Sequence, residues 1–101
     1  MTQSVIHQPR VAWDAARAFV RMAGGPHYEA FADRVRLGLG SQVYAELATT
    51  HHRLLAASMQ SGDRFATDVA AGQWRVRLED LLRTDPSLVT PLRELTEAAA
   101  R

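Results

Sequence analysis

The segment RFATDVAAGQWRVRLEDLLR, residues 64–83, decides the fold that this sequence predicts. Its apolar residues recur every three or four positions, which is typical of an α-helix. They form two stripes that lie on nearly opposite faces of that helix. We expect the larger stripe to face the core of the protein, and it consists of Ala70, Ala71, Trp74, Leu78, Leu81 and Leu82.

The smaller stripe, called the seam below, consists of Phe65, Val69, Gly72 and Val76. Its successive spacings of four, three and four residues resemble a short coiled-coil seam. One interpretation is internal packing, because a central helix of a small bundle contacts neighbours on two sides. The other is that Phe65, Val69 and Val76 form an interface for a second protein chain, including a copy of this one.

The sequence on both sides of this segment predicts further helices. Asp85-Pro86 ends the long helix because proline cannot continue it, and Thr90-Pro91 is typical of a new helix start. Residues 61–63 predict a turn in which Asp63 caps the helix that follows. Earlier helices are expected over residues 10–23, 26–39 and 41–60, with breaks at Gly24-Gly25 and Gly40 and an N-cap at Ser41.

No segment alternates apolar and polar residues in the manner of a β-strand. The sequence therefore predicts an all-α fold, a small antiparallel helical bundle of four to five helices with short connections. We expect residues 1–8 to form a mobile N-terminal arm. Residues 9–101 are expected to form a single helical-bundle domain.

Composition excludes several classes of function. The chain has 101 residues and a formal net charge of +1, so no global field attracts it to nucleic acid or to an anionic membrane. It contains no cysteine, which excludes disulfides, cysteine-ligated metals and a thiol nucleophile. No signal peptide or apolar run of membrane-spanning length is visible, and a cytoplasmic location is expected.

The adjacent histidines His51 and His52 are the most reactive-looking feature of the chain. Adjacent helical residues point about 100° apart, and neither histidine has a carboxylate one helical turn away. Ser58 lies two turns from His51, roughly 10 Å along the axis, which is too far for a Ser–His pair. We expect no catalytic residue, no metal site and no cofactor. His51 should form a hydrogen bond to a neighbouring helix, and His52 should be exposed.

Residues 45–99 resemble a helical module of uncharacterised small proteins from actinobacteria such as streptomycetes. The pattern consists of Leu54-Leu55, Gly62-Asp63, Trp74 with Leu78 and Leu81-Leu82, Asp85-Pro86, and Leu88, Leu92 and Leu95. Pro91 departs from the usual final helix of such modules. The resemblance implies an accessory partner of larger signalling or defence proteins, some with ATPase cores, and it supplies no functional residues.

The sequence thus favours a non-enzymatic interaction or accessory module, which either forms homo-oligomers or docks on a larger protein. The alternative is a small nucleic-acid-binding regulator that uses arginine-rich helix faces. Arg34 and Arg36, like Arg75 and Arg77, occur in RVR stretches, but acidic residues flank both stretches. A nucleic-acid partner is therefore the weaker hypothesis.

Overall fold

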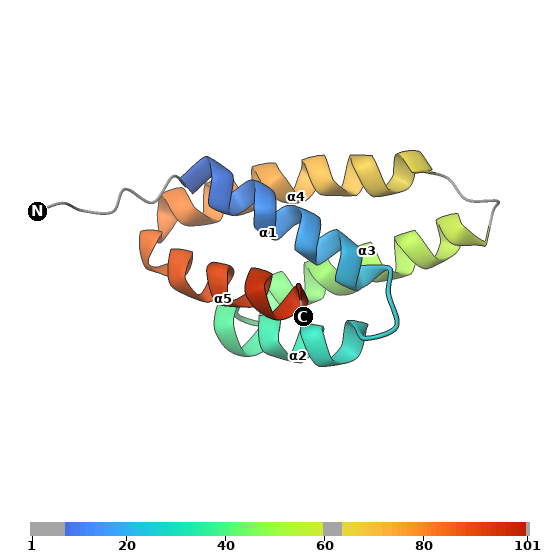
Figure 1. The fold of residues 1–101 in the computed structure, drawn as a ribbon, viewed down its shortest axis with the longest axis horizontal. Coiled ribbons are helices and arrows are strands. Elements are labelled where there is room, and N and C mark those ends of the chain that lie inside the picture. The colour runs from blue at the N-terminus through green and yellow to red at the C-terminus, as the bar shows by residue number, and fades with distance from the viewer. Residues whose placement is uncertain (1–7, 60–63, 101) are drawn as a thin grey trace, which may run out of the picture.

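The computed structural model describes residues 8–59 and 64–100, which form five α-helices and no strand (Figure 1). The predicted all-α fold of packed helices is confirmed. The helices are α1 (Gln8–Ala23), α2 (Tyr28–Leu39), α3 (Ser41–Ser58), α4 (Arg64–Thr84) and α5 (Val89–Ala99), and a 3₁₀ turn, Pro86–Leu88, precedes α5. None of the helices in these ranges is both long enough and apolar enough to cross a membrane.

Helix α1 is the centre of the structure. It packs most extensively against α4 and α5, and it also contacts α3 (Figure 1). Its buried face is rich in alanine, which allows neighbouring helices to approach closely: Ala12, Ala15, Ala16, Ala18 and Ala23. Helix α2 completes the arrangement by packing against α3 and α5.

Three aromatic rings connect α1 to α2 and α4. The ring of Phe19 in α1 lies edge-on to Phe31 of α2, with centroids 5.4 Å apart. It also lies edge-on to Trp74 of α4, with centroids 5.0 Å apart. Edge-to-face pairs of this kind stabilise a core beyond the area that they bury, by about 0.5–1.5 kcal/mol each.

Helices α3 and α4 pack against each other less extensively than α1 packs against α4 or α5. Polar contacts hold α3 and α4 together. The indole Nε1 of Trp74 donates to Thr50 Oγ1 at 2.8 Å, and Thr50 Oγ1 donates to the Glu46 carbonyl at 3.2 Å. One turn further along, Arg77 Nε donates to the Glu46 carboxylate at 2.8 Å. Because Thr50 and Trp74 are buried, water does not compete for their hydrogen bond.

Two predicted helix starts are corrected. Gly40, with a φ of 101°, lies between α2 and α3 and is the N-cap of α3, so Ser41 is the first helical residue and not the cap. The positive φ favours glycine at this position. Helix α5 begins at Val89, so Thr90 and Pro91 lie inside its first turn. Proline fits there because N–H groups of a first turn have no partner within the helix.

The end of α4 follows the prediction. The carboxylate of Asp85 accepts hydrogen bonds from the Ser87 N–H at 3.2 Å and from Ser87 Oγ at 2.6 Å, and Pro86 starts the 3₁₀ turn. The predicted turn at 61–63, with Asp63 as its cap, lies outside the described residues. So do residues 1–7 of the predicted arm, whereas Gln8 is the first residue of α1.

Thr50 provides a test of the α3–α4 contact. Thr50→Val keeps the shape of the side chain but leaves the buried indole N–H without an acceptor, so we expect a loss of about 1–3 kcal/mol in unfolding free energy. Thr49→Val is the matched control, because Thr49 is exposed and bonds only to the Ala45 carbonyl of its own helix. Urea unfolding of both variants measures the difference, and equal losses would contradict the assigned role.

Candidate functional site

The two faces of α4 have different environments. The larger stripe faces the core: Ala70, Trp74, Leu78 and Leu82 are buried, and Ala71 and Leu81 are half-buried. The seam faces away from the bundle, with Phe65 74%, Val69 53% and Val76 50% exposed. The interpretation of the seam as internal packing is therefore wrong for this structure, which leaves the seam as a surface feature.

Gly72 lies in the middle of the seam. A Cβ atom built on Gly72 meets no atom within 4 Å, so the space above this residue is open. The backbone at Gly72 is thus the lowest point of an apolar ridge that has larger side chains on both sides. Another helix approaches most closely at such a point.

Charged residues border the seam. Asp68 is exposed on one flank, and on the same flank Arg75 forms an ion pair with Glu79 at 3.0 Å. Asp80, on the other flank, pairs at 2.7 Å with Arg83, which lies in line with the seam. Pairs within one helix such as these contribute a few tenths of a kcal/mol at most. The seam is therefore an apolar strip with charged margins, the usual composition of a helix that pairs with another helix.

Other large apolar side chains are also exposed, but on other faces. Leu37 of α2 is 80% exposed, and Leu55 and Met59 of α3 are 44% and 85% exposed. Helical spacing alone predicts an apolar stripe on α3 that includes Leu55 and Met59, and that prediction is wrong because both side chains are exposed. The buried face of α3 consists of Val43, Leu47, Thr50 and Leu54. Compared with the stripe that includes Leu55 and Met59, this face is rotated around the helix toward Thr50.

The two histidines have different hydrogen-bond partners, as predicted, although their rings lie edge-on to each other with centroids 5.5 Å apart. His51 Nδ1 donates to the Ala23 carbonyl at the end of α1, at 2.7 Å. Its ring stacks on Tyr28 of α2, with centroids 3.8 Å apart and an interplanar angle of 3°. His52 is exposed and bonds to the Ala48 carbonyl of its own helix. His51 therefore joins three helices, which is a structural role.

The described residues provide little for catalysis or metal binding. Within residues 8–59 and 64–100, no three His, Cys, Asp or Glu side chains are close enough to hold a metal ion. The Ser58 hydroxyl donates to the Leu55 carbonyl of its own helix at 2.9 Å. The geometry thus offers no support for a Ser–His pair or for a metal centre in this part of the chain.

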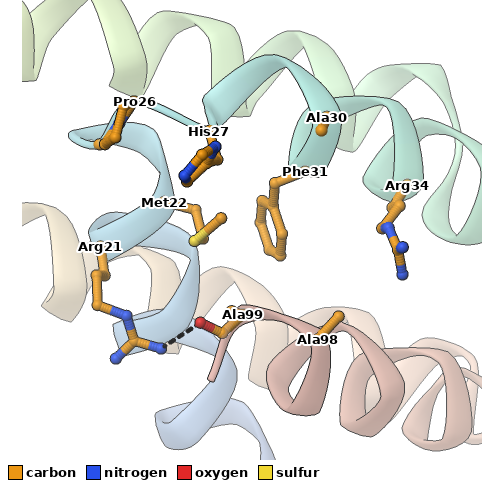
Figure 2. Close-up of a pocket in the computed structure, with 10 residues that line it drawn as sticks. Arg21, Met22, Pro26, His27, Ala30, Phe31, Arg34, Ala98 and Ala99 are labelled. Atoms are coloured by element: carbon orange, nitrogen blue, oxygen red, sulfur yellow. Dashed lines mark hydrogen bonds between the residues drawn. The ribbon is translucent and has the colours of Figure 1, made fainter. Parts of the chain in front are cut away.

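A hollow of about 520 Å³ opens where the ends of α1 and α5 meet the start of α2 (Figure 2). Arg21 Nη2 donates to the Ala99 carbonyl at 3.3 Å, so this guanidinium caps the end of α5. His27 and Arg34 add two further basic groups, and Phe31 and Met22 lie between them. None of the described residues that line the hollow carries a hydroxyl or a carboxylate, so it assembles no nucleophile with a base.

Thr50 and Arg21 also connect helices, and neither role was predicted from the sequence. Thr50 occupies a position of the apolar series Val43, Leu47, Thr50 and Leu54, and its place at core spacing is a signal that could have identified it. Arg21 carries no comparable signal. Its partner, the Ala99 carbonyl, lies 78 residues away in sequence, and only the fold brings the two together.

The assigned roles of the two histidines are testable by substitution. His51→Ala removes both the stacking on Tyr28 and the hydrogen bond to Ala23, so we expect a loss of about 1–3 kcal/mol in unfolding free energy. His51→Phe keeps an aromatic ring and should lose less. His52→Ala, the neighbouring control, should change stability by less than about 0.5 kcal/mol. Urea unfolding compares the three variants, and a His52→Ala loss as large as that of His51→Ala contradicts the assignment.

Tyr28 makes stability sensitive to alkaline pH. Burial raises the pKa of Tyr28 above its ordinary value of 10.0, and the nearby Tyr44 and Glu29 raise it further. The folded state therefore favours the neutral phenol, and this contribution is complete below pH 10.0 and is lost as pH rises through the raised pKa. Unfolding free energy should fall over this range in the native protein. The fall should be smaller in Tyr28→Phe, and equal falls would contradict the prediction.

Comparison of the chain with protein families, with curated proteins and with solved structures found no match. The resemblance of residues 45–99 to helical modules of actinobacteria thus stays a prediction from the sequence. The candidate functional site is defined by its geometry alone, and it is the exposed seam on α4.

Proposed function

We propose that this chain is a non-enzymatic protein–protein interaction module that presents the seam of α4 to an amphipathic helix of a partner protein. One observation carries the proposal: Phe65, Val69 and Val76 are each at least half exposed on one face of a well-packed helix. The opposite face of α4 already supplies the core. The seam is thus not needed to complete the fold, and contact with another protein is the function that best accounts for it.

The shape and spacing of the seam specify the kind of partner. A straight ridge of apolar residues spaced four, three and four positions apart matches the interdigitating side chains of paired helices. A small molecule binds in a concave pocket instead, and the seam is convex. An amphipathic helix covers the ridge along its length and places its own charged margins beside Asp68 and Arg75.

Nucleic-acid binding has less support from the structure. Several arginines already pair with carboxylates within the chain: Arg10 with Asp14, Arg75 with Glu79, Arg77 with Glu46 and Arg83 with Asp80. Binding to phosphates depends on a surface where basic groups gather without acidic neighbours. The paired arginines provide no such surface. Arg21, His27 and Arg34 do gather around the hollow without a carboxylate, but Arg21 is already bonded to the Ala99 carbonyl.

The wider setting of the module is part of the same proposal. The composition and the resemblance to actinobacterial helical modules support a cytoplasmic accessory protein that joins a larger signalling or defence protein. A homo-oligomer uses the same seam. Both arrangements require that Val69 contacts another protein chain in the cell.

Photo-crosslinking tests the proposal in cells that produce the chain. A benzoylphenylalanine residue replaces Val69 in one variant and Thr67 in the control. Thr67 is exposed on the other side of α4. We expect position 69 to form an adduct with a single defined protein, identified by mass spectrometry, and position 67 to form none. Absence of an adduct at position 69, or equal adducts at both positions, overturns the proposal.

A charge placed on the seam provides the matched loss of function. Phe65→Glu, made in the variant that carries the probe at position 69, should abolish the adduct because a carboxylate cannot enter an apolar contact without loss of hydration. The control is Leu37→Glu, which places the same charge on an equally exposed leucine of α2. Circular dichroism should show folded protein in all variants, since these side chains are exposed.

A further inference from the structure

We infer that the partner helix is α4 of a second copy of this chain, paired with the first in an antiparallel, two-fold symmetric arrangement. This inference rests on the proposed function, because it names the partner of the same seam. It is carried by the self-complementarity of the seam in size and charge. Figure 1 shows α4 along the upper edge of the bundle, with the other helices of the chain below it.

The apolar layers fit each other in the antiparallel register. In an antiparallel helix pair with seam positions at this spacing, Val69 faces Gly72 of the second copy, and Phe65 faces its Val76. The two-fold axis repeats both layers, which makes four in total. Each layer thus combines a larger residue with a smaller one, and Val69 enters the open space above Gly72.

The charged margins also fit in this register. Positions on one flank of a helix face the same flank of an antiparallel partner, so Asp68 faces Arg75 of the second copy, twice in the dimer. Asp68 has no ion-pair partner within the residues that the structure describes. Arg75 is partly exposed beside Glu79, with its Cζ 6.0 Å from the centroid of the Trp13 ring of α1, and it retains N–H groups for another carboxylate.

The parallel arrangement fits less well. It gains a contact between Arg75 and Asp80 of the second copy, but it places Gly72 against Gly72 and leaves a gap in the middle of the seam. Glu79 and Arg83 continue the seam positions toward the end of α4. In a parallel pair, each of them faces the same residue of the second copy. Like charges at these positions destabilise a parallel pair.

The length of the seam predicts the strength of the association. Four layers make a contact at the small end of specific protein interfaces, below about 1,200 Å² of total buried surface. We therefore expect a reversible dimer whose population rises with concentration, and not an obligate one. Sedimentation velocity over a hundredfold range of concentration measures this, and Phe65→Glu with Val69→Glu should shift the protein to monomer while Leu37→Glu does not.

Disulfide capture tests the register. The chain has no cysteine, so introduced thiols are the only ones present. Phe65→Cys and Val76→Cys are prepared as separate variants and mixed under mild oxidation. Positions 65 and 76 lie about 16 Å apart along the helix, so the antiparallel register yields the mixed disulfide and neither homodisulfide. We expect the mixed product to exceed each homodisulfide at least about tenfold, whereas Leu37→Cys with either variant gives only slow, random pairing.

Charge reversal provides an independent measurement. Asp68→Arg places like charges together twice in the dimer, and we expect the dimer dissociation constant to rise about tenfold. Combining it with Arg75→Asp restores opposite charges and should return the constant to within about threefold of the native value. Helix content by circular dichroism controls for the change beside Glu79. Failure of the double variant to recover overturns the pairing of Asp68 with Arg75.

The outcomes separate this inference from the proposed function. A protein that stays monomeric at every concentration, or that forms mainly homodisulfides, overturns the antiparallel pair. If photo-crosslinking at position 69 then yields an adduct with a different protein, the proposed function stands and only the partner is wrong. If position 69 yields no adduct in cells, the proposed function fails as well.

Discussion

The indole of Trp74 is the contact on which the rest of the structure depends. It lies edge-on to Phe19 of α1, and its N–H donates to Thr50 of α3. One side chain of α4 thus fixes the orientation of α4 relative to two other helices. Because residues on a helix keep constant angular offsets, burying Trp74 also determines which residues of α4 face outward. The exposure of Phe65, Val69 and Val76 follows from that constraint.

Helix α4 has two apolar faces, yet only one of them is buried in the core. The stripe around Trp74 includes several leucines, whereas the seam has one glycine and three apolar side chains. Burial contributes about 25 cal/mol for each Å² of apolar surface removed from water, so the larger stripe wins the place in the core. The hydrogen bond to Thr50 adds a directional preference that an apolar stripe alone lacks. The seam therefore faces outward because burying the larger stripe stabilises the fold more.

Periodicity predicted the helices and the core stripe of α4 from the sequence, because both depend on local spacing. The end of α4 was also predictable, since Asp85 and Pro86 act on their immediate neighbours. The sequence could not predict whether the seam lies in the core or on the surface. Spacing gives the angle of a residue around its own helix, but it does not show which other helices pack on each side. Thr50 shows the same limit, since a threonine between apolar residues acquires its meaning only when Trp74 arrives from another helix.

The two faces of α4 differ in how strongly the stability of the fold restricts their residues. Phe65, Val69 and Val76 are each at least half exposed, whereas Trp74 and Leu78 are buried, so the core restricts the identity of the three seam residues less. A polar residue at positions 65, 69 or 76 costs the fold little, and it would lower the risk of non-specific aggregation that exposed apolar side chains carry. Stability alone therefore gives no reason for apolar residues at these three positions. Their presence together, at the spacing of a paired helix and with Asp68 and Arg75 on one margin, supports the proposed contact with another helix.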